Sequence, residues 1–156
     1  MLSWIKDIYS WNYLLAVPFT AWISAQIIKT ILNFVLVGNL NLERMWGAGG
    51  MPSAHSATVC SLIVASGRLL GTNSPIFALS VILAAIVMYD AMGVRRETGE
   101  QAKILNQLLT DWMDEESKRN PIFADKQLKE MVGHTPFEVL GGAVWGVVVG
   151  LVIPVM

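Results

Sequence analysis

The stretch PIFALSVILAAIVMYDAMG, residues 75–93, is apolar almost throughout and carries its only charge, Asp90, near its end. A helix needs roughly 20 mainly apolar residues to cross the hydrocarbon core of a bilayer. Residues 53–70 and 136–155 are also long apolar runs, and residues 13–37 form a longer run interrupted by Gln26, Lys29 and Asn33. The sequence therefore predicts an all-α fold: a polytopic membrane helix bundle of about four transmembrane helices in a single domain, residues 1–156.

The composition supports a membrane environment. Hydrophobic residues make up 54% of the chain and charged residues 15%, whereas soluble domains carry about 25% charged residues. The net charge of −1, with no basic stripe among aromatics, predicts no nucleic-acid partner. Cys60 is the only cysteine, which excludes an internal disulfide and a thiolate metal cluster.

Two further helices are expected outside the spans. Residues 2–12 carry three aromatic residues suited to the headgroup level, which predicts an N-terminal interfacial helix. The one hydrophilic block, residues 95–133, begins with apolar residues at helical spacing: Ala102, Leu105, Leu108, Leu109 and Trp112. This period predicts an amphipathic helix that either lies on the membrane or caps the bundle.

With four crossings, the loops at 38–52 and 94–135 fall on one side of the membrane. With Lys29, Arg44, Arg95 and Arg96 set aside as candidate functional residues, that side holds five Lys and Arg residues against two on the other. The positive-inside rule then makes it cytoplasmic, so we expect an integral protein of the cytoplasmic membrane.

The last span carries small residues at a spacing of four: Gly142, Gly146 and Gly150. Such glycines let two helix backbones approach closely. The pattern is equally compatible with packing inside the chain and with a homodimer through this face.

The polar residues of the spans fall at one end of the expected bundle, the cytoplasmic end. They are Lys29, Arg44, His55, Asp90, Arg95, Arg96, His134 and Glu138. Cations and helix N-termini bind phosphate, and histidine acts as a nucleophile or a general acid near neutral pH. Ser53 at the start of its helix and Gly50 before it are candidates for the rest of a phosphate site.

Structural roles are open for several of these residues. Ser53 is a good N-cap, and Thr135 with Glu138 fits a capping box, T-x-x-E. Lys29 can extend its amine toward the membrane surface, and Arg95 and Arg96 can serve as topology anchors. The phosphate hypothesis depends on their occurring together.

Three blocks of this sequence resemble a known family: GGMPSAHSA (49–57), YDAMGVRRETGEQAKILN (89–106) and GHTPFEVLGGAVWG (133–146). They resemble the divergent bacterial branch of the type 2 phosphatidic acid phosphatase superfamily, which is related to vanadium haloperoxidases. In that resemblance Lys29 corresponds to the first-motif lysine, with Arg44 in place of its arginine. His55 corresponds to the second-motif histidine, and His134 with Glu138 to the third-motif H-x3-D. The third-motif arginine is Arg95 or Arg96, which a long insertion separates from His134.

The resemblance implies a membrane-embedded phosphatase that hydrolyses a phosphomonoester or pyrophosphate of a phospholipid or prenyl lipid. His134 would form a phosphohistidine, Glu138 would orient it, and His55 would protonate the leaving group. Lys29, Arg44, Arg95, Arg96 and Ser53 would bind the phosphate, without a metal or another cofactor. Two alternatives stay open: a phosphatase with Mg²⁺ held by Asp90, Glu97 or Glu138, and a membrane protein that binds lipids or anions without catalysis.

Overall fold

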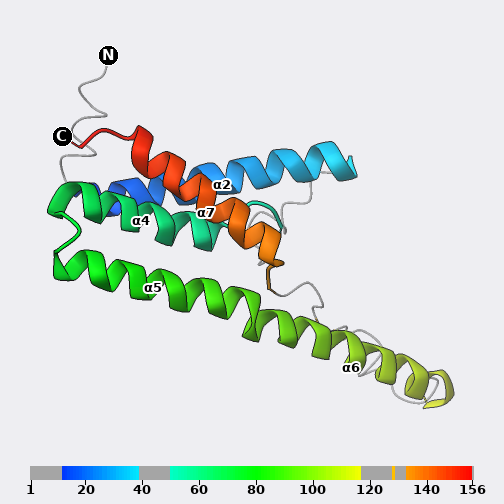
Figure 1. Ribbon diagram of the computed structural model, residues 1–156. Coiled ribbons are helices and arrows are strands. Elements are labelled where there is room, and N and C mark those ends of the chain that lie inside the picture. The colour runs from blue at the N-terminus through cyan, green and yellow to red at the C-terminus, as the bar shows by residue number, and fades with distance from the viewer. Residues whose placement is uncertain (1–11, 39–49, 117–127, 129–132, 156) are drawn as a thin grey trace.

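The computed structural model describes residues 12–38, 50–116, 128 and 133–155 (Figure 1). Its helices are α2 (Tyr13–Val37), α4 (Ala54–Leu70), α5 (Pro75–Met92), α6 (Val94–Glu116) and α7 (Pro136–Val152). The described residues contain no strand. The all-α prediction is confirmed. Of the interfacial helix expected at residues 2–12, residues 2–11 lie outside the described residues, as does Arg44, and Asn12 is the extended N-cap of α2.

Four helix N-termini are capped as their sequences predict. Asn12, Ser53, Ser74 and Thr135 each accept a hydrogen bond from a backbone N–H of the first turn. These caps satisfy donors that have no partner inside the helix. At its other end, α7 stops at Val152, short of the expected residue 155. Pro154 explains this, because a proline disfavours helical backbone in the residue before it.

Helix α4 lies at the centre of the bundle, in contact with α2, α5 and α7 (Figure 1). Helix α7 also packs on α2, whereas α2 and α5 do not contact each other along their described lengths. Cβ atoms added at Gly142 and Gly146 would collide with the α4 backbone at Ser53 and Ala57. The close approach of α4 and α7 therefore depends on these glycines.

The glycine stripe is occupied inside the chain. Gly142, Gly146 and Gly150 are buried, and all three face α4. Of the two alternatives for this face, packing inside the chain is therefore the one that the structure shows, whereas the homodimer stays a prediction.

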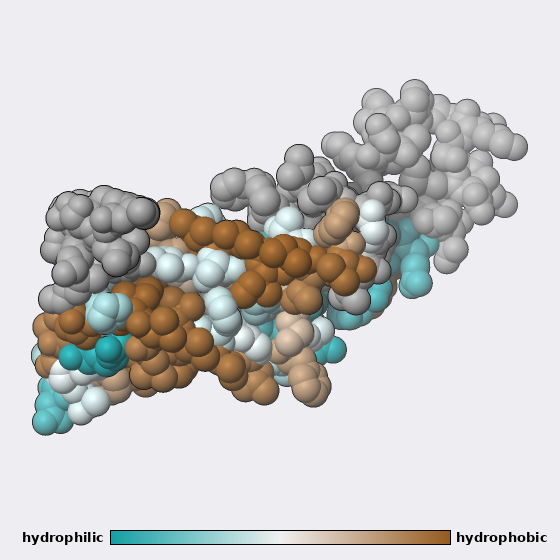
Figure 2. Space-filling view, turned by 90° about the horizontal axis from the view of Figure 1, so that it is seen from above, coloured by the Kyte–Doolittle hydropathy of each residue, from teal (hydrophilic) through white to brown (hydrophobic). Residues whose placement is uncertain are grey.

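The apolar exterior fits a membrane protein. Large apolar side chains of α2 and α5, such as Phe19, Ile27, Leu79 and Ile86, are exposed on the bundle surface. Figure 2 shows broad apolar areas over the described bundle. Residues 13–35 and 75–108 form helices long and apolar enough to cross a membrane. Helices α4 and α7 are apolar but have 17 residues each, about 26 Å of helix.

Helix α6 follows α5 after Gly93 and extends beyond the bundle (Figure 1). The amphipathic helix predicted in the hydrophilic block is therefore present. Among the described helices it contacts α5 alone, so it does not cap the bundle. Leu105 and Leu108 on α6 are exposed.

At the end of the bundle opposite to the polar residues, Arg68 connects α4 to the C-terminus of α7. This side chain, near the end of α4, donates hydrogen bonds to the backbone oxygens of Gly150, Leu151 and Ile153. The Tyr13 hydroxyl donates to the Ile153 oxygen at 3.1 Å. A cation at the C-terminus of α7 satisfies carbonyls without a helical partner and matches the helix dipole.

Candidate active site

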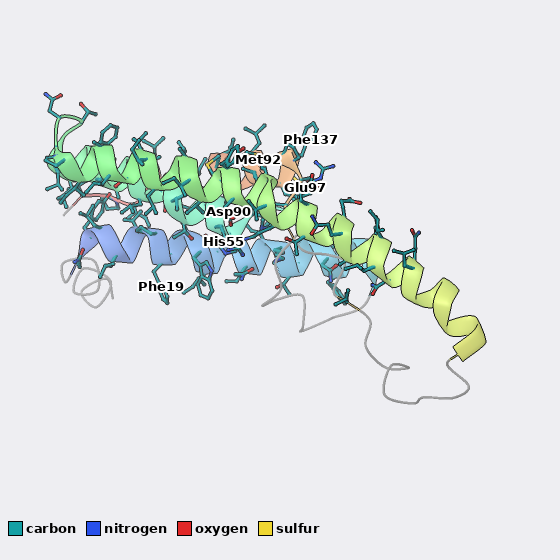
Figure 3. All side chains as sticks on the ribbon, turned by 90° about the horizontal axis from the view of Figure 1, so that it is seen from below. Phe19, His55, Asp90, Met92, Glu97 and Phe137 are labelled. Carbon is teal, nitrogen blue, oxygen red and sulfur yellow. The ribbon has the colours of Figure 1, made fainter. Side chains whose placement is uncertain are left out.

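Six of the predicted polar residues come together where α5 ends and where α4 and α7 begin, beside the part of α2 that carries Lys29: Lys29, His55, Asp90, Arg95, His134 and Glu138. Figure 3 shows His55 and Asp90 in the space between α2 and α5, with Phe19 pointing away from it. The charges of Lys29, Asp90 and Arg95 all influence the His55 ring, which places these residues near it. Residues far apart in the sequence thus form one polar cluster.

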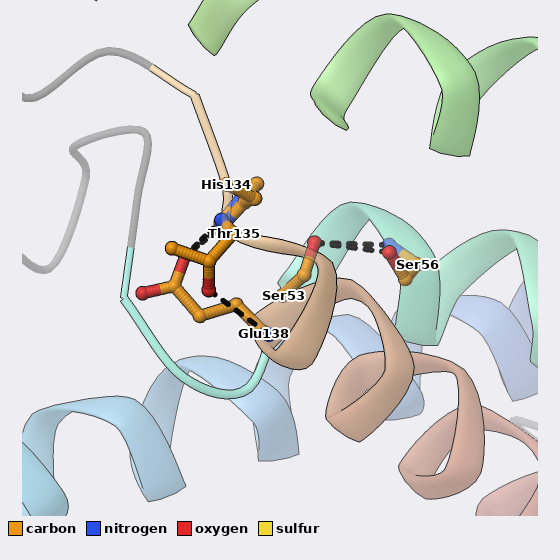
Figure 4. A network of polar contacts seen from close by, with 5 residues as sticks. All are labelled: Ser53, Ser56, His134, Thr135 and Glu138. Carbon is orange, nitrogen blue, oxygen red and sulfur yellow. Dashed lines mark hydrogen bonds and ion pairs between the residues drawn. The ribbon is translucent and has the colours of Figure 1, made fainter. Parts of the chain in front are cut away.

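His134 and Glu138 form its centre (Figure 4). The Nδ1 atom of His134 lies 3.3 Å from the Oε2 atom of Glu138. The same carboxylate oxygen accepts a hydrogen bond from the Thr135 backbone N–H at 2.9 Å, and the Thr135 hydroxyl accepts one from the Glu138 N–H. This is the predicted capping box, but Glu138 does both jobs: it caps α7 and holds the histidine ring.

The environment of His134 favours a neutral ring. Burial lowers the pKa of His134 below its ordinary value, and the hydrogen bond and charge of Glu138 raise it in partial opposition. His55 and Lys29 add smaller lowering effects on this pKa. Because a carboxylate can only accept, Nδ1 carries the proton of the neutral ring, and Nε2 holds the free lone pair.

His55 is the second ring of the cluster, in the first turn of α4. The centroids of the His55 and His134 rings are 6.0 Å apart, and their planes meet at 65°. His55 is exposed, whereas His134 is 3% exposed. The two histidines therefore form an outer and an inner ring at one end of the bundle.

Two of the predicted cations belong to this cluster. Lys29 is buried, its aliphatic stem packs against Gly50, and its charge interacts with that of Glu138. Arg95 donates from Nε to the Asp90 carboxylate at 2.7 Å. The guanidinium group has further N–H donors on its terminal nitrogens, which can serve a phosphate.

The other predicted residues have different positions. Arg96 is exposed in the first turn of α6. Ser53 is fully buried as the N-cap of α4, and its Oγ atom accepts from the Ser56 hydroxyl at 3.1 Å (Figure 4). The N-cap interpretation of Ser53 is therefore confirmed. The Ser53 backbone N–H donates a hydrogen bond to the backbone oxygen of Glu138 at 3.0 Å, which connects the start of α4 to the first turn of α7.

The sequence reasoning missed a backbone connection at this site. The His134 N–H donates to the Ala91 oxygen at 3.0 Å, and Gly133 packs against the backbone of Arg95 and Arg96. The long insertion thus returns the chain to the place where Arg95 stands. The sequence feature that pointed to this backbone connection was Gly133, directly before His134.

Two of the three carboxylates proposed for a metal, Asp90 and Glu138, have protein partners. Asp90 pairs with Arg95, and Glu138 binds His134 and Thr135. The described part of the chain holds no group of three or more His, Cys, Asp or Glu side chains placed to bind a metal ion.

Comparison with known proteins gives the family of this chain. The profile of the family described as "Divergent PAP2 family" matches residues 10–149. The chain is also similar to "Uncharacterized membrane protein YuiD" of Bacillus subtilis (strain 168), with 40% identity over 148 residues, covering 91% of this chain and 94% of the relative. No solved structure matches. The profile match spans α2, α4, α5, α6 and nearly all of α7, with all the described polar residues of the cluster, so the chain belongs to the divergent PAP2 family.

Proposed function

We propose that this protein is a lipid phosphate phosphatase that works through a phosphohistidine on His134. The observation that carries the proposal is the His134–Glu138 pair at 3.3 Å with the second ring, His55, beside it. A histidine held at one nitrogen by a carboxylate presents the other nitrogen as a nucleophile. A second histidine nearby supplies the acid that such a reaction needs.

In the first step, Nε2 of His134 attacks the phosphorus of the phosphomonoester, and the bond from phosphorus to the lipid oxygen breaks. His55 in its protonated form gives its proton to the departing alkoxide, which leaves as an alcohol. The His134 ring becomes cationic as the N–P bond forms, and the Glu138 carboxylate stabilises this charge across Nδ1.

In the second step, neutral His55 accepts a proton from water as the water oxygen attacks phosphorus. The N–P bond breaks, its electron pair returns to Nε2, and inorganic phosphate leaves. His55 is then protonated again, so the cycle closes without another reactant. This reversal of roles follows from general acid–base catalysis in two related steps.

The phosphate oxygens are bound by cations at the same end of the bundle. Lys29 supplies a buried ammonium, and Arg95 supplies the terminal nitrogens of its guanidinium. Arg44 and Arg96 are proposed to add positive charge for phosphate binding. Positive charge that the protein holds in place where negative charge develops in the transition state is among the largest contributions to the catalysis of phosphoryl transfer.

The lipid character of the substrate is inferred from the apolar exterior and the helices long enough to span a membrane. A phosphomonoester or pyrophosphate at the headgroup level could approach the exposed His55 from the bilayer. We propose that the site faces the cytoplasm, in agreement with the distribution of Lys and Arg.

The test is phosphate release by purified protein in detergent from phosphatidate, phosphatidylglycerophosphate, a prenyl phosphate and a prenyl pyrophosphate, with and without a chelator. His134→Ala should abolish release and any acid-labile phosphate label on the protein. His55→Ala should slow lipid substrates strongly and an aryl phosphate little, because an aryl leaving group departs without a proton. Arg68→Ala, at the opposite end of the bundle, is the matched control.

Equal release by wild type and His134→Ala would refute the phosphohistidine. Loss of release on chelation would favour the metal-assisted alternative. Tight lipid binding without turnover, unchanged in His55→Ala, would favour a lipid-binding protein in place of an enzyme.

A further inference from the structure

The segment that leads into His134 contacts the junction between α5 and α6, residues 90–96. Gly133 lies directly on the backbone of Arg95 and Arg96, and the next residue donates its N–H to the Ala91 oxygen at 3.0 Å. Two successive residues of the returning chain are therefore seated on this junction.

The same junction places the arginine of the cluster. Gly93, with φ −98° and ψ −92°, separates α5 from α6. Asp90 on α5 pairs with Arg95 on α6 at 2.7 Å and bridges the interruption. The position of Arg95 is thus set by the junction on which Gly133 rests.

Only glycine fits at position 133. A Cβ atom there would lie 2.5 Å from the backbone nitrogen of Arg96 and 2.7 Å from the carbonyl carbon of Arg95. Neither neighbour is the end of a flexible side chain, so a larger residue must separate the two segments. Gly133 also has φ +101°, a backbone conformation that residues with a Cβ atom rarely adopt.

We infer that Gly133 is a positioning residue: its contact with the α5–α6 junction sets His134 at a fixed place relative to Arg95. This inference rests on the proposed function for its consequence in catalysis, but the placement itself can be measured without activity. In sequence the two side chains are 39 residues apart, so this contact, and not a local spacing, brings the two segments together.

The first measurement follows His134 directly. The chain has two histidines, so histidine-labelled protein in detergent should show two ring signals, assigned with His55→Ala. In Gly133→Ala the inner ring should lose burial, and its titration midpoint should rise toward the ordinary value of about 6.5. With an active wild type, kcat should fall about 100-fold and KM much less, as for a misplacement of about 1 Å.

Gly71→Ala is the matched control. Gly71 also has a positive φ, +82°, but a Cβ atom there would meet nothing within 4 Å. This variant carries the backbone strain without the collision and lies at the far end of the bundle. It should leave both the His134 titration and kcat at wild-type values.

A second measurement needs no substitution. In the wild type, the His134 amide hydrogen should exchange as slowly as the amides within α7, because it is bonded to Ala91. Free exchange of this amide, or an unchanged His134 titration in Gly133→Ala, would overturn the inference. So would the same change in Gly71→Ala. If the wild type releases no phosphate, the proposed function fails while the titration and exchange results still decide the placement.

Discussion

Replacing Glu138 by glutamine separates its two roles. A glutamine at the third helical position also completes a capping box, so α7 keeps its cap. The amide has no charge, however, and cannot stabilise a cationic His134 ring as a carboxylate does. We therefore expect Glu138→Gln to keep the stability of the protein and to lose activity.

The size of the loss follows from the geometry. Unit charges 3.3 Å apart interact by about 5 kcal/mol at an effective dielectric constant of about 20, and by about 1 kcal/mol in water. The Glu138 side chain is 22% exposed and His134 is 3% exposed, which places the pair between these limits. Since 1.36 kcal/mol corresponds to a factor of ten, kcat should fall between about 10-fold and about 5,000-fold.

The assay compares wild type, Glu138→Gln and Glu138→Ala in phosphate release and in thermal unfolding in detergent. Alanine should also remove the half of the capping box that the Glu138 side chain supplies, its bond from the Thr135 N–H, at a further cost of about 1 kcal/mol in unfolding free energy. Glu138 raises the pKa of His134, so this pKa should be lower in the glutamine variant. The acid limb of its kcat–pH profile should therefore lie at lower pH than in the wild type. Wild-type kcat in Glu138→Gln would refute the role of the carboxylate in the reaction, and equal stability of the two variants would refute the role of the cap.

Three further predictions concern stability. Burial lowers the pKa of His134 in the folded protein, so as the pH falls below about 6.5 the unfolded chain takes up a proton on this ring before the folded protein does. The unfolding free energy therefore falls with pH in this range. Thermal unfolding of His134→Asn should lack this part of the pH dependence. Gly146→Ala should destabilise the protein by about 1–3 kcal/mol because its Cβ atom meets the α4 backbone, whereas Gly141→Ala, which meets only the end of Met51, should cost less by the same measurement. Arg68→Ala should lower the unfolding free energy by about 1–3 kcal/mol by leaving α7 carbonyls without their donor, while kcat stays unchanged; a matching fall in kcat would contradict the separation of the two ends.

Glu138 both caps α7 and contacts His134. The T-x-x-E pattern predicts a capping box, and the family resemblance implies a contact between Glu138 and His134. Both predictions hold at once, because a carboxylate oxygen can accept from more than one donor. Neither interpretation excludes the other.

Sequence alone determined the helices and the end of the bundle at which the polar residues meet. The expected runs at 13–37, 53–70 and 75–93 correspond to α2, α4 and α5 within a residue at each end. Apolar length, caps and proline act locally, so their effect is visible in the sequence. Since each span reverses direction, the order of the helices also puts Lys29, His55, Asp90 and His134 at one end.

Only the tertiary structure decided how those residues are arranged. It turned the glycine stripe of α7 inward to α4, buried Ser53 as a cap, and selected Arg95 as the cation beside Asp90. It also seated Gly133 on the junction between α5 and α6, which brings His134 to Arg95 across the long insertion. These are contacts between backbones and buried side chains distant in sequence, and no local pattern specifies which segments will pack together.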